Sequence, residues 1–159
     1  MLTMKQLSGA STENQADIRA VAAIEGIIQA QDAWDYQVLS DLLAQPSISL
    51  LVVTRADDNK VVVVGYCLYQ VVFEQAEILR IGTHLEYQRQ GIASQLFIRL
   101  NKQLQQQQAE SLLLEVRADN GAAIALYQQQ GFKVIHQRQG YYQQPQQPAI
   151  DALIMQLQL

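Results

Sequence analysis

Apolar residues recur along the chain with two different periods, and the change from one period to the other marks the predicted elements. Alternating or continuous apolar runs rich in β-branched residues are typical of strands. They predict seven strands, at residues 1–7, 48–54, 61–72, 76–83, 111–116, 132–139 and 149–159. In the last of these, the residues expected to point inward are Leu153, Met155, Leu157 and Leu159.

Helices are predicted where apolar residues return every three or four positions. The first predicted helix begins after Ser11 and Thr12 and ends at Ile28, and the second covers residues 35–43. The third runs from Ile92 to Leu104, and the fourth begins at Ala122 and stops at Gly131, because a glycine there is a typical C-terminal signal of a helix. Because these helices lie between strands, the order β-α-α-β-β-β-α-β-α-β-β predicts an α/β fold. We expect a mixed sheet of about seven strands flanked by about four helices. No repeat or linker divides residues 1–159, so one domain is expected.

Composition narrows the classes of protein that fit this chain. Charged residues make up only 16% of it, and 27 glutamines supply much of the polarity. The glutamine runs are flanked by periodic apolar residues, which favours solvated helix faces and loops over a disordered tract. The net charge of −4 provides no overall basic field for nucleic acid. No apolar run approaches the ~20 residues that span a bilayer, and no signal peptide is evident, so we expect a cytoplasmic protein without a membrane partner.

Residues that commonly form metal or nucleophile sites are scarce. Cys67 is the only cysteine and lies in an apolar run, so an internal disulfide is excluded and a buried core thiol is expected. His84 and His136 are the only histidines and leave little material for a zinc site or a catalytic triad. We therefore predict no metal centre.

The segment Ile81–Ser94 points to a particular chemistry. It runs from a predicted strand through a polar turn into an amphipathic helix. Such a turn aims unpaired backbone N–H groups at one point, where the helix dipole adds partial positive charge, so an anion fits there. Gly91 and Ala93 would let a pyrophosphate approach the backbone closely. A glycine before a helix is also common turn punctuation, and the Gly-Lys-Ser/Thr ending of a Walker loop is absent.

Two motifs in order resemble those of the GCN5-related N-acetyltransferases (GNAT). Residues 88–93, Gln-Arg-Gln-Gly-Ile-Ala, match the Gln/Arg-x-x-Gly-x-Gly/Ala acetyl-CoA signature. Residues 120–132 are similar to the Asn-x-x-Ala-x-x-Leu-Tyr-x-x-x-Gly-Phe segment. The intervening Leu-Glu-Val-Arg-Ala-Asp-Asn at 114–120 resembles the RimI-type ribosomal-protein alanine N-acetyltransferases, as do Tyr141-Tyr142 and residues 151–155. The resemblance runs from about residue 61 to residue 159.

This resemblance implies a GNAT-like fold with acetyl-CoA as the acetyl donor. In the family, N–H groups of the first motif bind the CoA pyrophosphate, and the preceding strand pairs with the pantetheine amides. The implied cofactor-binding residues are Ile81, Gly82, Thr83, Arg89, Gln90, Gly91, Ile92, Ala93, Ser94 and Asn120. Asn120 is also a good N-cap, and the two roles are compatible. The chain departs from the family at Gly82-Thr83 and Leu85, where Ala-Val or Val-x-Pro is usual, and this leaves the geometry of the loop before Gln88 open.

Acetyl transfer explains two further residues of the motifs. An amine attacks a thioester only as the free base, and an α-amino group, with a pKa near ~8, loses its proton more easily than lysine near ~10.4. By resemblance, Glu115 is the general base that takes this proton, directly or through water. Its alternative role is a strand carboxylate facing solvent. By resemblance, Tyr127 is the general acid that protonates the departing thiolate, although an aromatic residue at helical spacing is usually part of a core.

The resemblance therefore predicts an acetyl-CoA-dependent N-acetyltransferase that acts by direct attack in a ternary complex. The implied acceptor is the N-terminal α-amino group of a protein, namely that of the N-terminal alanine of the eighteenth small-subunit ribosomal protein. Two other interpretations stay open: a lysine, polyamine or other small amine as acceptor, and a CoA-binding module without turnover, which would need neither Glu115 nor Tyr127. A deep acidic pocket would favour a polyamine as the acceptor. Also open are the roles of Trp34 and of Tyr141-Tyr142, which either line a peptide groove or pack as a hairpin.

Overall fold

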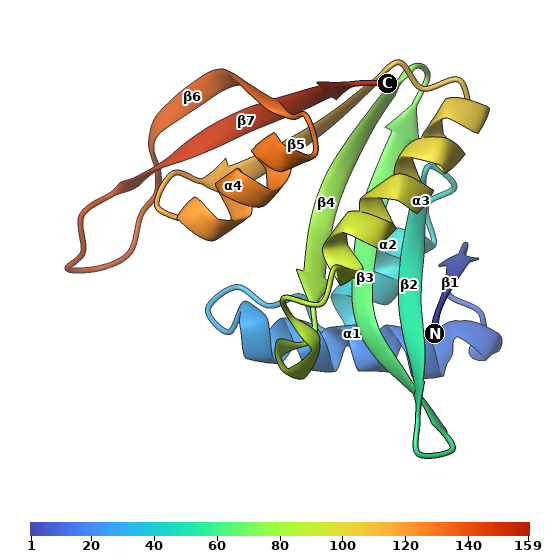
Figure 1. Cartoon of the computed structure of the whole chain (residues 1–159). Coiled ribbons are helices and arrows are strands. Elements are labelled where there is room, and N and C mark those ends of the chain that lie inside the picture. Colours follow the sequence, from blue (N-terminus) through green and yellow to red (C-terminus); the bar gives the residue numbers. More distant parts are fainter.

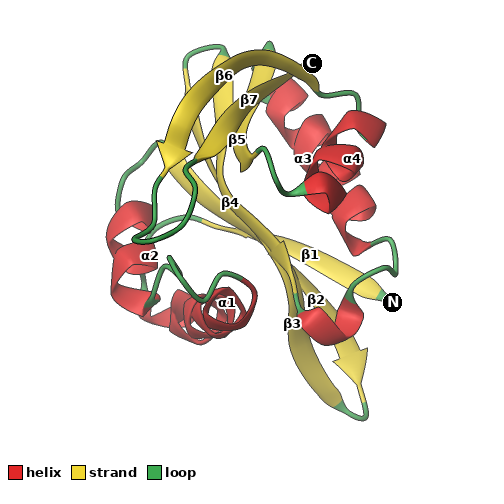
Figure 2. Ribbon diagram, turned by 90° about the vertical axis from the view of Figure 1, so that its left-hand side faces the viewer, coloured by secondary structure: helices red, strands yellow, loops and turns green.

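The structure, a computed structural model, describes residues 1–159 and consists of a seven-stranded sheet with a pair of helices on each face (Figure 1 and Figure 2). The strands are β1 (Leu2–Leu7), β2 (Ile48–Asp57), β3 (Lys60–Val72), β4 (Gln75–Thr83), β5 (Ser111–Arg117), β6 (Lys133–Tyr142) and β7 (Ile150–Gln158). They lie in the order β1-β2-β3-β4-β5-β7-β6. All neighbours are antiparallel except β4 and β5, which are parallel. The predicted mixed α/β sheet is confirmed.

Four α-helices complete the fold, as predicted: α1 (Gln15–Ile28), α2 (Tyr36–Leu43), α3 (Ile92–Gln106) and α4 (Gly121–Gln129). Asn120 caps α4, because its side-chain oxygen accepts the N–H of Ala123 at 3.2 Å. The predicted N-cap is therefore confirmed. Strands β2 and β6 continue past their predicted ends, because backbone pairing extends to Asp57 of β2 and to Tyr142 of β6.

Apolar side chains fill one layer on each face of the sheet. The larger layer packs α3 and α4 against the strands, and the smaller packs α1 and α2. Cys67 is fully buried in the larger layer, and burial raises the pKa of its thiol, so the predicted core thiol is confirmed. The inward direction predicted for β7 is also confirmed: Met155 is fully buried in this layer, and three partly buried leucines pack against it, at positions 153, 157 and 159. None of the helices combines the length and the apolar character that a membrane span requires.

The parallel pair β4 and β5 separates along its length. Register is kept only at Gln75, Ala76 and Glu77 of β4, opposite Ser111, Leu112 and Leu113 of β5. The separation begins at a β-bulge, because β3 pairs Tyr69 with Ile78 and then Leu68 with Arg80, which leaves Leu79 as the extra residue. A bulge bends and twists its strand, and the β5–β7–β6 part of the sheet accordingly turns away from β4 (Figure 1). This opening in the sheet positions the candidate site.

Candidate active site

A cleft of about 1280 Å³ occupies the opening between β4 and β5. Its walls are the diverging ends of these strands, the start of α3, one side of α4, the loop after α1 and the residues that follow β6. Eleven of the twelve residues predicted for the site line it, although they come from separate parts of the chain. The exception is Gln90, whose side chain turns outward and accepts a hydrogen bond from Arg55 at 2.7 Å.

The turn before α3 has the backbone shape of an anion site. Arg89 and Gly91 adopt left-handed conformations, with φ of 65° and 79°, and Gly91 is the N-cap of the helix. Gln95 donates the bond that reaches back to the Gly91 carbonyl, so the N–H groups of the first helical turn have no intrahelical acceptor. A Cβ added at Gly91 would meet no protein atom within 4 Å, so the space above this residue is free for a ligand.

The end of β4 offers a free backbone edge to the cleft. Ile81, Gly82 and Thr83 pair with β3 on one side, whereas their other edge faces the opening left by β5. An extended ligand with amide groups can add to such an edge as a strand does. A Cβ at Gly82 would collide with Ile28 and with the Tyr66 hydroxyl, so only glycine lets α1 approach β4 this closely. This packing explains the departure from the family pattern at this position.

Tyr127 on α4 forms a largely buried wall of the cleft. Its ring packs edge-on against Phe97, with centroids 6.1 Å apart, and only 8% of the residue is exposed. Burial raises the pKa of Tyr127 to about 12, with the nearby Cys67 as a second cause. The phenol therefore keeps its proton at neutral pH and can donate it.

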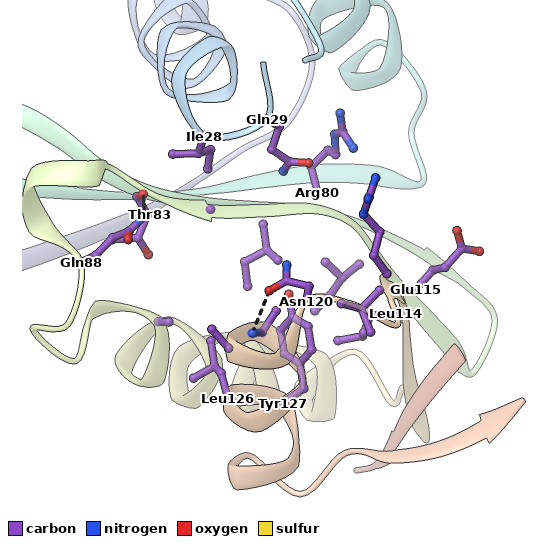
Figure 3. A pocket seen from close by; sticks show the side chains of 18 of the residues that line it. Ile28, Gln29, Arg80, Thr83, Gln88, Leu114, Glu115, Asn120, Leu126 and Tyr127 are labelled. Carbon is purple, nitrogen blue, oxygen red and sulfur yellow. Dashed lines mark hydrogen bonds between the residues drawn. The ribbon is translucent and has the colours of Figure 1, made fainter. Parts of the chain in front are cut away.

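Glu115 lies on the opposite face of β5 from Tyr127. It alternates along the strand with the buried Leu114 and Val116, and its carboxylate points away from Tyr127 (Figure 3). One oxygen accepts a hydrogen bond from the Tyr142 hydroxyl at 2.9 Å, and the other lies 3.9 Å from a guanidinium nitrogen of Arg138. Burial, followed by this hydrogen bond, raises the pKa of Tyr142, so the phenol remains the donor. The cleft thus carries a carboxylate on one face of the sheet and a phenol on the other.

The charges that line the cleft differ in sign from the net charge of the chain. Three arginines line it, Arg80, Arg89 and Arg117, against the two carboxylates Asp32 and Glu115. Asp32 lies 3.5 Å from Arg80, and Glu115 lies near Arg138, so each lining carboxylate has a basic partner. The lining suits an anionic ligand and contains no unneutralised acidic pocket.

The tyrosine pair, His84 and Trp34 also have definite places in the structure. Tyr142 lines the cleft. Tyr141 is half exposed, and its ring packs edge-on against the ring of Tyr142. His84 caps the short 3-10 turn Leu85–Tyr87 by accepting the N–H of Glu86 at 3.1 Å. Trp34 lies against Arg80, whose guanidinium carbon is 4.4 Å from the ring centroid.

Sequence reasoning missed the ion pair between Glu25 on α1 and Arg80 on β4. The Arg80 Nε donates to Glu25 at 2.8 Å, and the Glu25 side chain is completely buried. One signal was available: each is a charged residue within an otherwise apolar stretch, beside Ile24 and Ile81 respectively. Charged residues at such positions are usually paired with one another.

Comparison with known proteins agrees with this geometry. Residues 16–132 match the model of the acetyltransferase (GNAT) family. The [ribosomal protein bS18]-alanine N-acetyltransferase of Escherichia coli K12 is 40% identical over 78 residues, which are 49% of this chain and 53% of that protein. The chain thus spans about half the length of the curated relative that it matches.

Solved structures extend the likeness over the whole chain. The crystal structure of the ribosomal-protein-S18-alanine N-acetyltransferase from Escherichia coli superposes with a TM-score of 0.83 at 30% identity, covering 99% of this chain and 94% of that one. Arabidopsis thaliana NAA60 in complex with acetyl-CoA has a TM-score of 0.80 at 16% identity, with 100% and 99% covered, and shares the fold. Since the family model covers well over half of the sequence, this chain belongs to the acetyltransferase (GNAT) family.

Proposed function

We propose that this protein transfers an acetyl group from acetyl-CoA to the N-terminal amine of a protein by direct attack in a ternary complex. The observation that carries the proposal is the opening between β4 and β5. It joins the turn at the start of α3 to Glu115 on the far face of the sheet within one cleft. A cofactor and an acceptor can therefore enter from opposite faces and meet between the strands.

Acetyl-CoA fits the cofactor half of this cleft. The pyrophosphate lies on the N–H groups of the turn at Arg89–Ser94, where Gly91 leaves the backbone uncovered. The pantetheine arm extends along the free edge of Ile81–Thr83, with Asn120 on the facing wall (Figure 3). Arg89, the one lining arginine without an ion-pair partner, adds a positive charge beside this turn. The acetyl-CoA named for the NAA60 complex gives the same assignment by fold likeness.

The two ionisable groups divide the proton transfers between them. The amine nitrogen attacks the thioester carbonyl carbon, and its proton passes to the Glu115 carboxylate, directly or through a water molecule. When the tetrahedral intermediate collapses, the carbon–sulfur bond breaks and the electron pair leaves on sulfur. Tyr127 then gives its proton to the thiolate, and solvent restores the phenol. Glu115 and Tyr127 lie on opposite faces of β5, so the base and the acid can act on the reacting group from different sides.

Replacing Tyr127 with Phe should lower kcat by about 10-fold and leave the Kd of CoA within twofold. The effect is modest for a general acid, because a thiolate leaves without full protonation. Tyr69→Phe is the matched control: Tyr69 is also buried and its pKa is also raised to about 12 by burial, but it does not line the cleft. Steady-state rates with both variants decide the matter. If Tyr127→Phe keeps the wild-type rate, Tyr127 is not the general acid and only packs in the core.

The charge of the acceptor half favours an amine with a single positive charge. Glu115 and Asp32 each have a basic partner, so a polyamine finds no acidic pocket for its further charges. An α-amine also loses its proton more easily than lysine at neutral pH. The bS18-alanine acetyltransferases to which the chain is similar act on a protein N-terminus, and we infer the N-terminal alanine of that ribosomal protein as the acceptor.

A panel of acceptors tests this function directly. The protein is incubated with acetyl-CoA and three acceptors: a peptide with a free N-terminal alanine, the same peptide with a blocked N-terminus and an internal lysine, and spermidine. We expect the mass of one acetyl group to appear on the first peptide alone, located at its N-terminus by fragmentation. Modification of the lysine peptide or spermidine at an equal rate would contradict the assigned acceptor. If CoA binds but no acceptor is acetylated, the protein is a CoA-binding module without turnover.

A further inference from the structure

Arg80 connects the sheet to the loop between α1 and α2. Its side chain is only 12% exposed and lies on the α1 face of β4. The Nε donates to Glu25, one terminal nitrogen lies 3.5 Å from the Asp32 carboxylate, and the other donates to the Asp32 carbonyl. The flat face of the guanidinium stacks on Trp34. One side chain thus holds the loop through a carbonyl, a carboxylate and an indole ring.

Glu25 provides the fixed point for this arrangement. Its carboxylate accepts four hydrogen bonds, from Arg80 of β4, Tyr66 of β3, Gln29 at the end of α1 and the backbone N–H of Trp34. Burying a carboxylate is costly unless its oxygens are bonded, so displacing the loop would leave some of this bonding unsatisfied. The loop at residues 29–35 is therefore held to the sheet by hydrogen bonds through Glu25 and Arg80, and not by packing alone.

The fastened loop forms one wall of the acceptor half of the cleft. Gln29 and Asp32 line the cleft on the α1 side, where Figure 3 shows Gln29 beside Arg80. Arg117, near Glu115 on β5, lies across the opening. Arg117 and Asp32 line the same cleft, and the Gln144 side chain after β6 donates a hydrogen bond to Gln31 of the loop, so the loop and the β5–β7–β6 part of the sheet form its two walls. The position of the loop thus sets the width of the passage that leads to Glu115.

We propose that Arg80 is a positioning residue for the acceptor, which holds the loop at residues 29–35 as a wall of the acceptor passage. The proposal rests on the acetyltransferase function proposed above and names the residue through which acceptor binding is controlled. The partners of Arg80 are Glu25, Asp32 and Trp34, and none of them is the proposed base. Its loss should therefore weaken acceptor binding while the cofactor half, built on α3 and the free edge of β4, keeps its affinity.

Arg80→Lys tests this with the least damage to the fold. Lysine keeps a positive charge beside the buried Glu25, but it lacks the planar fork that reaches Asp32 and stacks on Trp34. We expect the KM for the alanine peptide to rise by about tenfold, the equivalent of one hydrogen bond in positioning the peptide, with kcat and the KM for acetyl-CoA within twofold. Arg19→Lys is the matched control. Arg19 stacks on Tyr36 at 4.1 Å between α1 and α2, and it does not line the cleft.

The single tryptophan gives a readout that does not depend on turnover. Trp34 is the only tryptophan of the chain, so its emission reports on this loop alone. In Arg80→Lys we expect a red shift and faster quenching by acrylamide at a temperature well below unfolding, and neither change in Arg19→Lys. If Arg80→Lys does not fold, the double variant Glu25→Gln/Arg80→Met removes both charges of the buried pair and should show the same changes.

The outcomes separate this inference from the proposed function. If Arg80→Lys shows the red shift and faster quenching of Trp34 but an unchanged KM for the peptide, the positioning role is overturned, because the loop would then not affect acceptor binding. An equal rise in the KM for acetyl-CoA would also overturn it, since the defect would then involve the whole cleft. Wild-type protein that acetylates no N-terminal peptide would instead contradict the proposed function, whatever the Trp34 signal shows.

Discussion

Glu115→Gln should lower kcat for an N-terminal peptide by roughly 100-fold at about pH 7, within the usual range for loss of a general base. The amide keeps the size of the carboxylate, and its oxygen can still accept the Tyr142 hydroxyl, so the change removes basicity and little else. CoA affinity should stay within twofold, because the turn before α3 is not altered. Isothermal titration with CoA and steady-state rates across pH measure both quantities.

The size of this defect should depend on pH in a defined direction. The α-amine has a pKa near ~8, so at lower pH most of the acceptor is protonated and needs the base, whereas near pH ~9.5 it arrives largely as free amine. The ratio of wild-type to variant rates should therefore shrink as pH rises. Tyr127, with its pKa raised to about 12, stays protonated throughout this range and does not add a titration of its own.

Glu77→Gln provides the control for this experiment. Glu77 is a carboxylate at the last paired position of β4, opposite Leu113 of β5, and it lies outside the cleft. Its loss removes the same charge from the neighbouring strand and should leave the rate unchanged. A defect of equal size in both variants would indicate a general electrostatic effect. A Glu115→Gln rate equal to wild type at every pH would remove Glu115 as the base.

The helices and strands could be predicted from local sequence signals, because the apolar residues of each follow the helical or the strand periodicity within one segment. The return of apolar residues along α3 and the glycine after α4 are signals within one segment, and both elements formed as predicted. The bulge at Leu79 has no such signal, since the residues around it continue the apolar pattern of an ordinary strand. The cleft depends on that bulge, so its shape could not be predicted from periodicity.

The site divides in the same way between local and distant interactions. The uncovered backbone at Gly91 and the Asn120 cap are properties of single turns, and the motifs identified both. The bond between Tyr142 and Glu115 joins residues 27 apart, and that between Arg80 and Glu25 joins residues 55 apart. Such pairs depend on how the strands and α1 pack, which no local pattern specifies. Gln90 shows the converse: its place in the motif fixes its backbone, while packing against Arg55 decides where its side chain turns.

The low charge of the chain now has a physical meaning at the site. Apart from Arg89, every charged residue that lines the cleft has a partner of opposite charge, so few formal charges are left to attract ligands. We therefore expect the pyrophosphate to be held mainly by backbone N–H groups at the start of α3. Changes in backbone access should consequently affect cofactor binding more than changes in surface charge.

Gly91→Val should weaken CoA binding by about 100-fold, because the branched side chain would occupy the space where the pyrophosphate meets the backbone. Loss of two charge-assisted hydrogen bonds at ~1.5 kcal/mol each gives a factor of this size. In the free protein the new Cβ meets no atom within 4 Å, so the steric effect falls on the ligand. The left-handed backbone, with φ of 79°, adds a separate cost of ~1–2 kcal/mol to folding.

Gly9→Val separates these two effects. Gly9 has a φ of 78°, has no atom within 4 Å of an added Cβ, and lies outside the cleft in the turn after β1. Both variants should therefore lose similar stability in thermal unfolding, whereas only Gly91→Val should lose CoA affinity by calorimetry. An equal loss of affinity in the two would mean that backbone strain, and not the blocked approach, weakens binding. An unchanged Kd in Gly91→Val would place the pyrophosphate elsewhere, since a turn that holds an anion by its N–H groups cannot tolerate a branched side chain above them.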